Sequence, residues 1–104
     1  MAHEISAQEL KAWLEEKSLL LLDVREVEER AGGFIPGSLH IPMRQVPFEL
    51  HRLEKDRPVV VYCAHGIRSA SVADFLERQG YQATSLQDGI YGWLESRGAI
   101  HYKP

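Results

Sequence analysis

The most reactive side chain in the sequence is the thiol of Cys63, the only cysteine among the 104 residues. A histidine, a glycine and an arginine follow it within the next five positions. Thiolate is the nucleophilic form of cysteine, and the thiol pKa falls near cations and where backbone N–H groups converge at the start of a helix. The pattern predicts an activated, partly exposed nucleophile. The alternative is a small, buried and inert cysteine.

The residues that follow the cysteine predict an anion-binding loop. Gly66 permits the backbone angles of a closed loop, and Arg68 adds a permanent charge whose planar N–H donors match oxyanions. His65 either contacts a substrate or faces solvent. With Cys63 as the catalytic residue, the predicted substrate-binding residues are Ala64, His65, Gly66, Ile67, Arg68 and Ser69.

A strand and a helix must hold this loop in place. Residues 59–62 are three valines and a tyrosine after Pro58, a run typical of a strand buried on both faces of a parallel sheet. After the loop, Val72, Phe75 and Leu76 recur at helical spacing, and Gly80 can end the helix. The cysteine is therefore expected between the carboxyl end of a strand and the amino end of a helix.

A second strand is expected to bring charged residues to the same edge of the sheet. Residues 19–22 are four leucines, and Asp23 and Arg25 follow them. If the two strands are parallel, this pair lies beneath the loop and supports it; an exposed ion pair of little energetic value is the alternative. The polar residues 26–30 predict a short helix with a solvated face.

The other elements alternate between helix and strand. Ser6 and Glu9 predict a capping box at the start of a helix that ends near Lys17. Further expectations are a strand at 39–41, a helix carrying Val46, Leu50 and Leu53, a strand at 82–86, and a last helix capped by Asp88 and ended by Gly98. This alternation predicts an α/β fold around a mostly parallel sheet of four or five strands.

Composition limits the class of protein. A chain of 104 residues with 44% hydrophobic and 26% charged residues is expected to be one soluble domain spanning residues 1–104. No apolar run, residues 19–22 included, is long enough to cross a membrane. A net charge of -3 with scattered basic residues argues against nucleic-acid binding. The single cysteine and the absence of a visible signal peptide favour a cytoplasmic protein.

Metal and redox chemistry within one chain are not expected. The five histidines are His3, His40, His51, His65 and His101. Their spacing is not that of metal ligands, and a single cysteine adds little to a metal site. Without a second cysteine, a cycle that forms a disulfide within the chain is excluded. Any group that Cys63 accepts must leave to another molecule, and no cofactor is needed.

Several landmarks together resemble a single-domain rhodanese. They are Leu-Asp-Val-Arg at 22–25, Gly-Phe-Ile-Pro-Gly-Ser at 33–38, Val-Tyr-Cys at 61–63 with Arg-Ser at 68–69, and Asp-Gly-Ile at 88–90 with Trp93. They follow the order and spacing of that family along nearly the whole chain. Phe34, Ser38 and Asp88 depart from its common pattern, but they lie outside the cysteine loop.

The resemblance implies a fold and an activity. The fold is a three-layer α/β/α sandwich with a central sheet of about five parallel strands. The activity is sulfurtransferase: Cys63 takes sulfur from a small anionic donor, thiosulfate or a persulfide, and holds it as a persulfide within the loop 64–68. Cyanide in an assay, or a thiol or protein in the cell, then accepts the sulfur, with no nucleic acid or membrane involved.

Three alternatives remain open at this point. The chain could be a binding module without activity, or a sensor in which a modified thiol is read by a partner. It could also be a cysteine phosphatase or arsenate reductase. In that pattern the arginine lies six positions after the cysteine, whereas Arg68 lies five positions after Cys63. The shorter loop forms a smaller bowl, better matched to one sulfur atom than to a phosphate.

Overall fold

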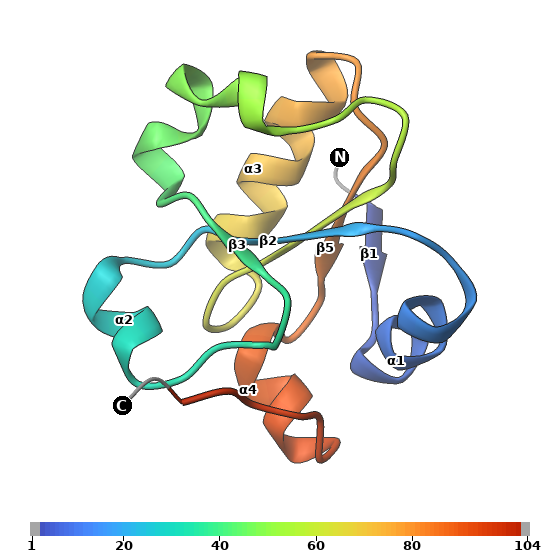
Figure 1. The fold of residues 1–104 in the computed structure, drawn as a ribbon, viewed down its shortest axis with the longest axis vertical. Helices are drawn as coiled ribbons and strands as arrows, with labels where there is room; N and C mark the ends of the chain where they lie inside the picture. The colour runs from blue at the N-terminus through green and yellow to red at the C-terminus, as the bar shows by residue number, and fades with distance from the viewer. Residues whose placement is uncertain (1–2, 103–104) are drawn as a thin grey trace.

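A computed structural model describes residues 3–102 and contains a central parallel sheet. Within these residues the sheet has five strands in the order β1-β5-β4-β2-β3, and every adjacent pair is parallel. The strands are β1 (His3–Ile5), β2 (Leu20–Asp23), β3 (Leu39–His40), β4 (Val59–Tyr62) and β5 (Ala83–Leu86). The predicted strand 59–62 is central, with β2 and β5 on its two sides (Figure 1).

Helices connect the strands, and α4 follows the last of them. They are α1 (Ala7–Glu16), α2 (Val27–Ala31), α3 (Ile67–Arg78) and α4 (Gly89–Glu95). The segment expected as one helix around Val46 is instead two 3-10 helices, η1 (Met43–Phe48) and η2 (Leu50–Arg52). Pro47 lies within the first of them, and proline disrupts the hydrogen bonding of a longer α-helix. No helix in the described part of the chain has the length and apolar character needed to span a membrane.

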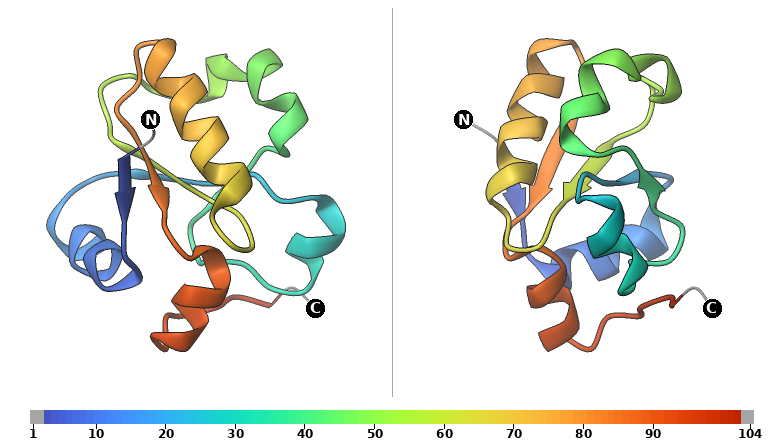
Figure 2. Two further views of the ribbon diagram at one scale, coloured as in Figure 1. Left: turned by 180° about the vertical axis from the view of Figure 1, so that it is seen from behind. Right: turned by 90° about the vertical axis from the view of Figure 1, so that its left-hand side faces the viewer.

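The two faces of the sheet bury separate apolar cores. Val59, Val61 and Cys63 point to the face covered by α3 and the 3-10 helices. Val60 and Tyr62 point to the opposite face, with Leu10 of α1 and Trp93 of α4 among their cluster. Figure 2 shows these helices in separate layers on either side of the strands. The predicted three-layer α/β/α fold is therefore confirmed.

The helix ends agree with the sequence at one site and differ at another. The capping box of α1 is present, with both the Ser6 and the Glu9 hydrogen bonds formed. Asp88 occupies the expected N-cap position of α4, but its side chain makes no capping hydrogen bond. Gly89 is the important residue at this position: its φ is +63°, and a Cβ there would overlap the carbonyl oxygens of Cys63 and Ala64. The glycine lets α4 pack directly against the cysteine loop.

Candidate active site

The cysteine lies immediately after β4, where the chain turns into α3. Gly66 makes this turn with a φ of +102°, and a Cβ at this position would overlap the carbonyl oxygen of Gln87. Glycine is therefore required both for the backbone angle and for the close approach of two segments. The Ile90 N–H donates to the Cys63 carbonyl at 2.9 Å, which holds the loop against the start of α4.

Hydrogen-bond donors converge on the Cys63 sulfur. The backbone N–H groups of Gly66 and Ser69 lie 3.2 and 3.3 Å from Sγ. The Ser69 Oγ lies 3.5 Å away, so it can accept from the thiol or donate to the thiolate. These donors come from the loop and the first turn of α3, where the helix dipole also favours negative charge. The site is therefore arranged to stabilise an anion on sulfur.

The predicted partial exposure of Cys63 was wrong, since the residue is only 1% exposed. The loop closes over the side chain, and the sulfur belongs to the core cluster on the α3 face. Burial alone would raise its pKa. Hydrogen bonds from the Ser69 side chain and from the N–H groups of Ser69, Gly66 and His65 outweigh burial, so that the pKa of Cys63 falls below its usual value. Burial here accompanies activation of the thiol.

A second serine extends this hydrogen-bond chain. Ser69 Oγ lies 2.7 Å from the Ser85 hydroxyl on β5, and both residues are fully buried. Ser85 can thus donate to Ser69 while Ser69 donates to the thiolate. The sequence analysis did not identify Ser85. The available signal was a serine in a strand next to the one that ends just before Cys63, but the inward direction of that serine depends on strand register.

Arg68 forms a bidentate ion pair with Glu29 of α2. Its two terminal nitrogens lie 2.7 and 2.8 Å from the two carboxylate oxygens. The hydrogen bonds from Arg68 lower the pKa of Glu29 to about 2, and Glu29 in turn raises the pKa of Arg68. The interpretation of the 26–30 helix as a merely solvated face was therefore wrong for Glu29. The role of Arg68 as a donor ligand stays a prediction.

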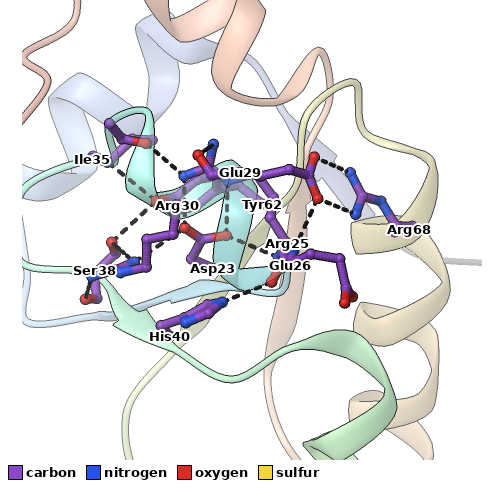
Figure 3. A network of polar contacts seen from close by, with 11 residues as sticks. Asp23, Arg25, Glu26, Glu29, Arg30, Ile35, Ser38, His40, Tyr62 and Arg68 are labelled. Carbon is purple, nitrogen blue, oxygen red and sulfur yellow. Dashed lines mark hydrogen bonds and ion pairs between the residues drawn. The ribbon is translucent and has the colours of Figure 1, made fainter.

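Asp23 and Arg25 form the predicted ion pair, and it is buried. The Arg25 Nε and a terminal nitrogen lie 3.0 and 2.9 Å from the two Asp23 oxygens. Arg30 and the Tyr62 hydroxyl also donate to Asp23, at 3.1 and 3.0 Å (Figure 3). The surface ion pair considered as the alternative is thus wrong, because Asp23 is 0% and Arg25 5% exposed.

This cluster, hereafter the Asp23 network, holds one ionised carboxylate at the carboxyl edge of the sheet. Burial would raise the pKa of Asp23, but the hydrogen bonds from Arg25 and Tyr62 outweigh burial and lower it. The Tyr62 hydroxyl also accepts from the Ile35 N–H at 3.1 Å and lies 3.1 Å from the Ser38 hydroxyl. Sequence reasoning identified the carboxylate and Arg25 but missed Arg30, Ser38 and the Tyr62 hydroxyl.

The remaining predicted loop residues lie at the surface of the same site. His65 stacks on Tyr91 of α4, with ring centroids 4.6 Å apart. Ala64 accepts from the Tyr91 N–H at 3.3 Å, and Ile67 is 81% exposed. Within residues 3–102, His, Cys, Asp and Glu form no group of three that could hold a metal ion.

Comparison with known sequences relates this chain to sulfurtransferases. The family model described as a rhodanese-like domain matches residues 6–96. YtwF of Bacillus subtilis (strain 168) is 40% identical over 86% of this chain and 88% of its own length. The sulfurtransferase of Allochromatium vinosum is 38% identical over 89% of both chains. The thiosulfate sulfurtransferase GlpE of Coxiella burnetii is 34% identical over 81% of both.

Solved structures agree with the fold. The rhodanese-like domain protein of Staphylococcus aureus is 35% identical, with a TM-score of 0.88 over 98% of this chain and 99% of its own. The rhodanese-related protein of Thermoplasma volcanium is 32% identical, with a TM-score of 0.91 over 97% of this chain and 99% of its own. These similarities extend over nearly the full length of each chain.

Proposed function

The chain belongs to the rhodanese-like domain family, and from this premise we propose that it transfers a sulfane sulfur through a persulfide on Cys63. Thiosulfate or a persulfide is the donor, and cyanide or a thiol is the acceptor. One observation carries the proposal: the N–H groups of Gly66 and Ser69 and the Ser69 hydroxyl converge on a single sulfur whose pKa they lower.

The first half-reaction loads the enzyme. The Cys63 thiolate attacks the outer sulfur of thiosulfate, the bond between the two donor sulfurs breaks, and sulfite leaves with the bonding electron pair. The product is a Cys63 persulfide anion, so the total charge is the same on both sides. The Gly66 and Ser69 N–H groups hold the attacking thiolate in place, and the loop 64–68 surrounds the added sulfur.

The second half-reaction returns the enzyme to its starting state. Cyanide or a thiolate attacks the outer sulfur of the persulfide, and the Cys63 thiolate leaves. The same N–H groups then stabilise the departing thiolate, which makes it a good leaving group. This cycle needs no cofactor and no metal. Its donor is a small sulfur compound, anionic in the case of thiosulfate, and its acceptor in the cell is a thiol or a protein. We place it in the cytoplasm.

A steady-state assay tests the proposal. Purified protein is incubated with thiosulfate and cyanide, and thiocyanate is measured, with a parallel assay that uses an organic persulfide as donor. Protein alkylated at Cys63 by iodoacetamide serves as the control. Turnover that disappears on alkylation supports the transferase. No turnover with either donor contradicts it and favours a sensor or a binding module.

A further inference from the structure

A cavity of about 270 Å³ opens beside the cysteine loop. Ala64, the residue directly after Cys63, lines it, and so do Arg25 and Glu29. Its opposite wall is made by α4 and by the segment that follows it. Figures 1 and 2 both show this segment leaving α4 and running toward α2, so that the cavity lies between the two helices and the loop.

The wall opposite the charged residues is apolar and aromatic. It consists of Ile90, Tyr91, Leu94, Ile100 and Tyr102. Tyr91, Leu94 and Tyr102 are 53%, 42% and 64% exposed, an unusual degree of exposure for three large side chains that line one cavity. Such a wall favours binding of a ligand with an apolar organic group, because binding removes the apolar surface of both the wall and the ligand from water.

The charges at this cavity are already paired. Glu29 takes up two donors of Arg68. Arg25 donates to Asp23 and to the carbonyl oxygens of Glu29 and Gly33. A dianion such as thiosulfate would therefore compete with Glu29 for Arg68, whereas a donor of lower charge with an apolar body would not.

We propose that this cavity binds the organic body of a persulfide donor, R–S–SH, in which R is a small apolar or aromatic group. The inference rests on the proposed function and specifies its donor. Bound there, the donor presents its terminal sulfur past Ala64 toward the loop. The Cys63 thiolate attacks that sulfur, the donor S–S bond breaks, and R–S⁻ leaves with the electron pair. The Cys63 side chain is then a persulfide, Cys63–S–SH, with one added sulfur atom, and it loses its proton to solvent.

Donor preference tests this inference. Benzyl hydropersulfide and thiosulfate are compared as donors, with cyanide as the common acceptor. Leu94→Trp fills the cavity, and Leu14→Trp on α1 is a matched control because both leucines are 42% exposed. We expect kcat/KM to favour the persulfide by at least about tenfold in the parent. Leu94→Trp should reduce that value roughly five- to tenfold for the persulfide and leave the thiosulfate value unchanged.

Two results would overturn the inference. One is a parent enzyme that prefers thiosulfate. The other is a Leu94→Trp variant in which kcat/KM changes equally for both donors, or for neither. Leu14→Trp, the control, should leave both values unchanged. Circular dichroism shows whether each variant is folded, and Leu94→Ser, which opens the wall instead of filling it, should also weaken use of the persulfide alone.

A binding measurement separates this inference from the proposed function. Benzyl mercaptan, the thiol product, is titrated into the Cys63→Ser variant by calorimetry, where no sulfur transfer takes place. Binding that Leu94→Trp weakens supports the cavity assignment even if no donor is turned over, in which case only the transferase proposal fails. If benzyl mercaptan does not bind while thiosulfate is turned over, the cavity assignment fails and the transferase proposal stands.

Discussion

The two polar clusters at the carboxyl edge of the sheet treat negative charge differently. In the Asp23 network, a permanent carboxylate is held by two guanidinium groups and a hydroxyl. Around the Cys63 sulfur, the hydrogen-bond partners are backbone N–H groups and a serine hydroxyl, all neutral. The first cluster binds a charge that never changes. The second stabilises a charge that can pass from thiolate to persulfide and back.

Neutral donors suit a sulfur that changes its state. A full positive charge within contact would hold the thiolate strongly and make it a poorer nucleophile. Fixed amide dipoles favour the anion without moving during the reaction. Arg68, in the first turn of α3, instead directs its two terminal nitrogens to the carboxylate of Glu29. The comparison thus separates residues that hold the fold from residues that perform chemistry.

Replacement of the nucleophile should have the largest effect on activity. We expect Cys63→Ser to reduce kcat/KM at least roughly 10³-fold, because a serine hydroxyl cannot form the persulfide. The free energy of unfolding should change by less than about 1.5 kcal/mol, because the substitution nearly conserves volume. Thiocyanate formation and urea unfolding measure the two effects. Retained turnover would remove Cys63 from the mechanism.

The Asp23 network should show the opposite pattern. We expect Asp23→Ala to lower the free energy of unfolding by about 3–5 kcal/mol, because the buried Arg25 and the partly buried Arg30 lose their carboxylate partner. Glu49→Ala removes an exposed partner of Arg52 and should cost less than about 1 kcal/mol in the same urea titration. Asp23→Asn provides a milder variant if the alanine variant fails to fold. Equal losses at positions 23 and 49 would contradict the comparison.

The serine that contacts the sulfur should set the pH range of activity. Ser69→Ala removes a hydrogen bond that favours the thiolate, so the pKa of Cys63 should rise. Activity falls as pH falls through that pKa, and the variant should therefore lose activity at a higher pH than the parent. At neutral pH we expect a loss of about three- to tenfold that disappears in alkaline buffer.

The rate of iodoacetamide alkylation against pH measures this shift directly. Ser71→Ala, on the exposed face of α3, is the matched control and should leave the profile unchanged. An unchanged profile for Ser69→Ala would show that the serine does not act on the thiol.

The Glu29 pair should have the smallest effect. Glu29→Gln leaves Arg68 with an uncompensated charge, so the KM for thiosulfate should fall about two- to fivefold, as expected for a partly exposed pair. Glu54→Gln removes the exposed partner of Arg57 and should not change this KM. A KM that is the same in both variants would show that Arg68 does not contact the donor.

The same pair predicts a pH dependence of stability. The pKa of Glu29 is about 2 in the folded chain and close to 4.5 without its partner. Because the folded pKa is the lower one, the stabilisation is complete above about pH 5 and is lost as pH falls toward 2. The difference in Tm between the parent and Glu29→Gln should shrink over that window, whereas a difference that grows would contradict the assignment.

Local patterns predicted the elements that hold the cysteine. The three valines before Tyr62 identified a buried central strand, and the Ser6 and Glu9 pair identified the start of α1. These features depend on neighbours within a few residues, so that periodicity and capping rules apply to them directly. The place of Cys63 at the carboxyl end of a parallel strand followed from the same reasoning.

Contacts between distant segments could not be predicted in this way. Glu29 and Arg68 are 39 positions apart, and a polar helix has the same sequence pattern whether it faces solvent or a partner. The Ser69 and Ser85 contact depends on the register of two strands, and the burial of Cys63 depends on how the loop closes against α4. Each of these features arises only when separate elements pack together.

Mass spectrometry of the persulfide tests the central claim most directly. The protein is treated with thiosulfate or benzyl hydropersulfide, freed of excess donor and digested without reductant. We predict that the peptide containing Cys63 gains the mass of one sulfur atom and loses it again on addition of cyanide, with formation of thiocyanate. A peptide that gains no sulfur from either donor would contradict the account.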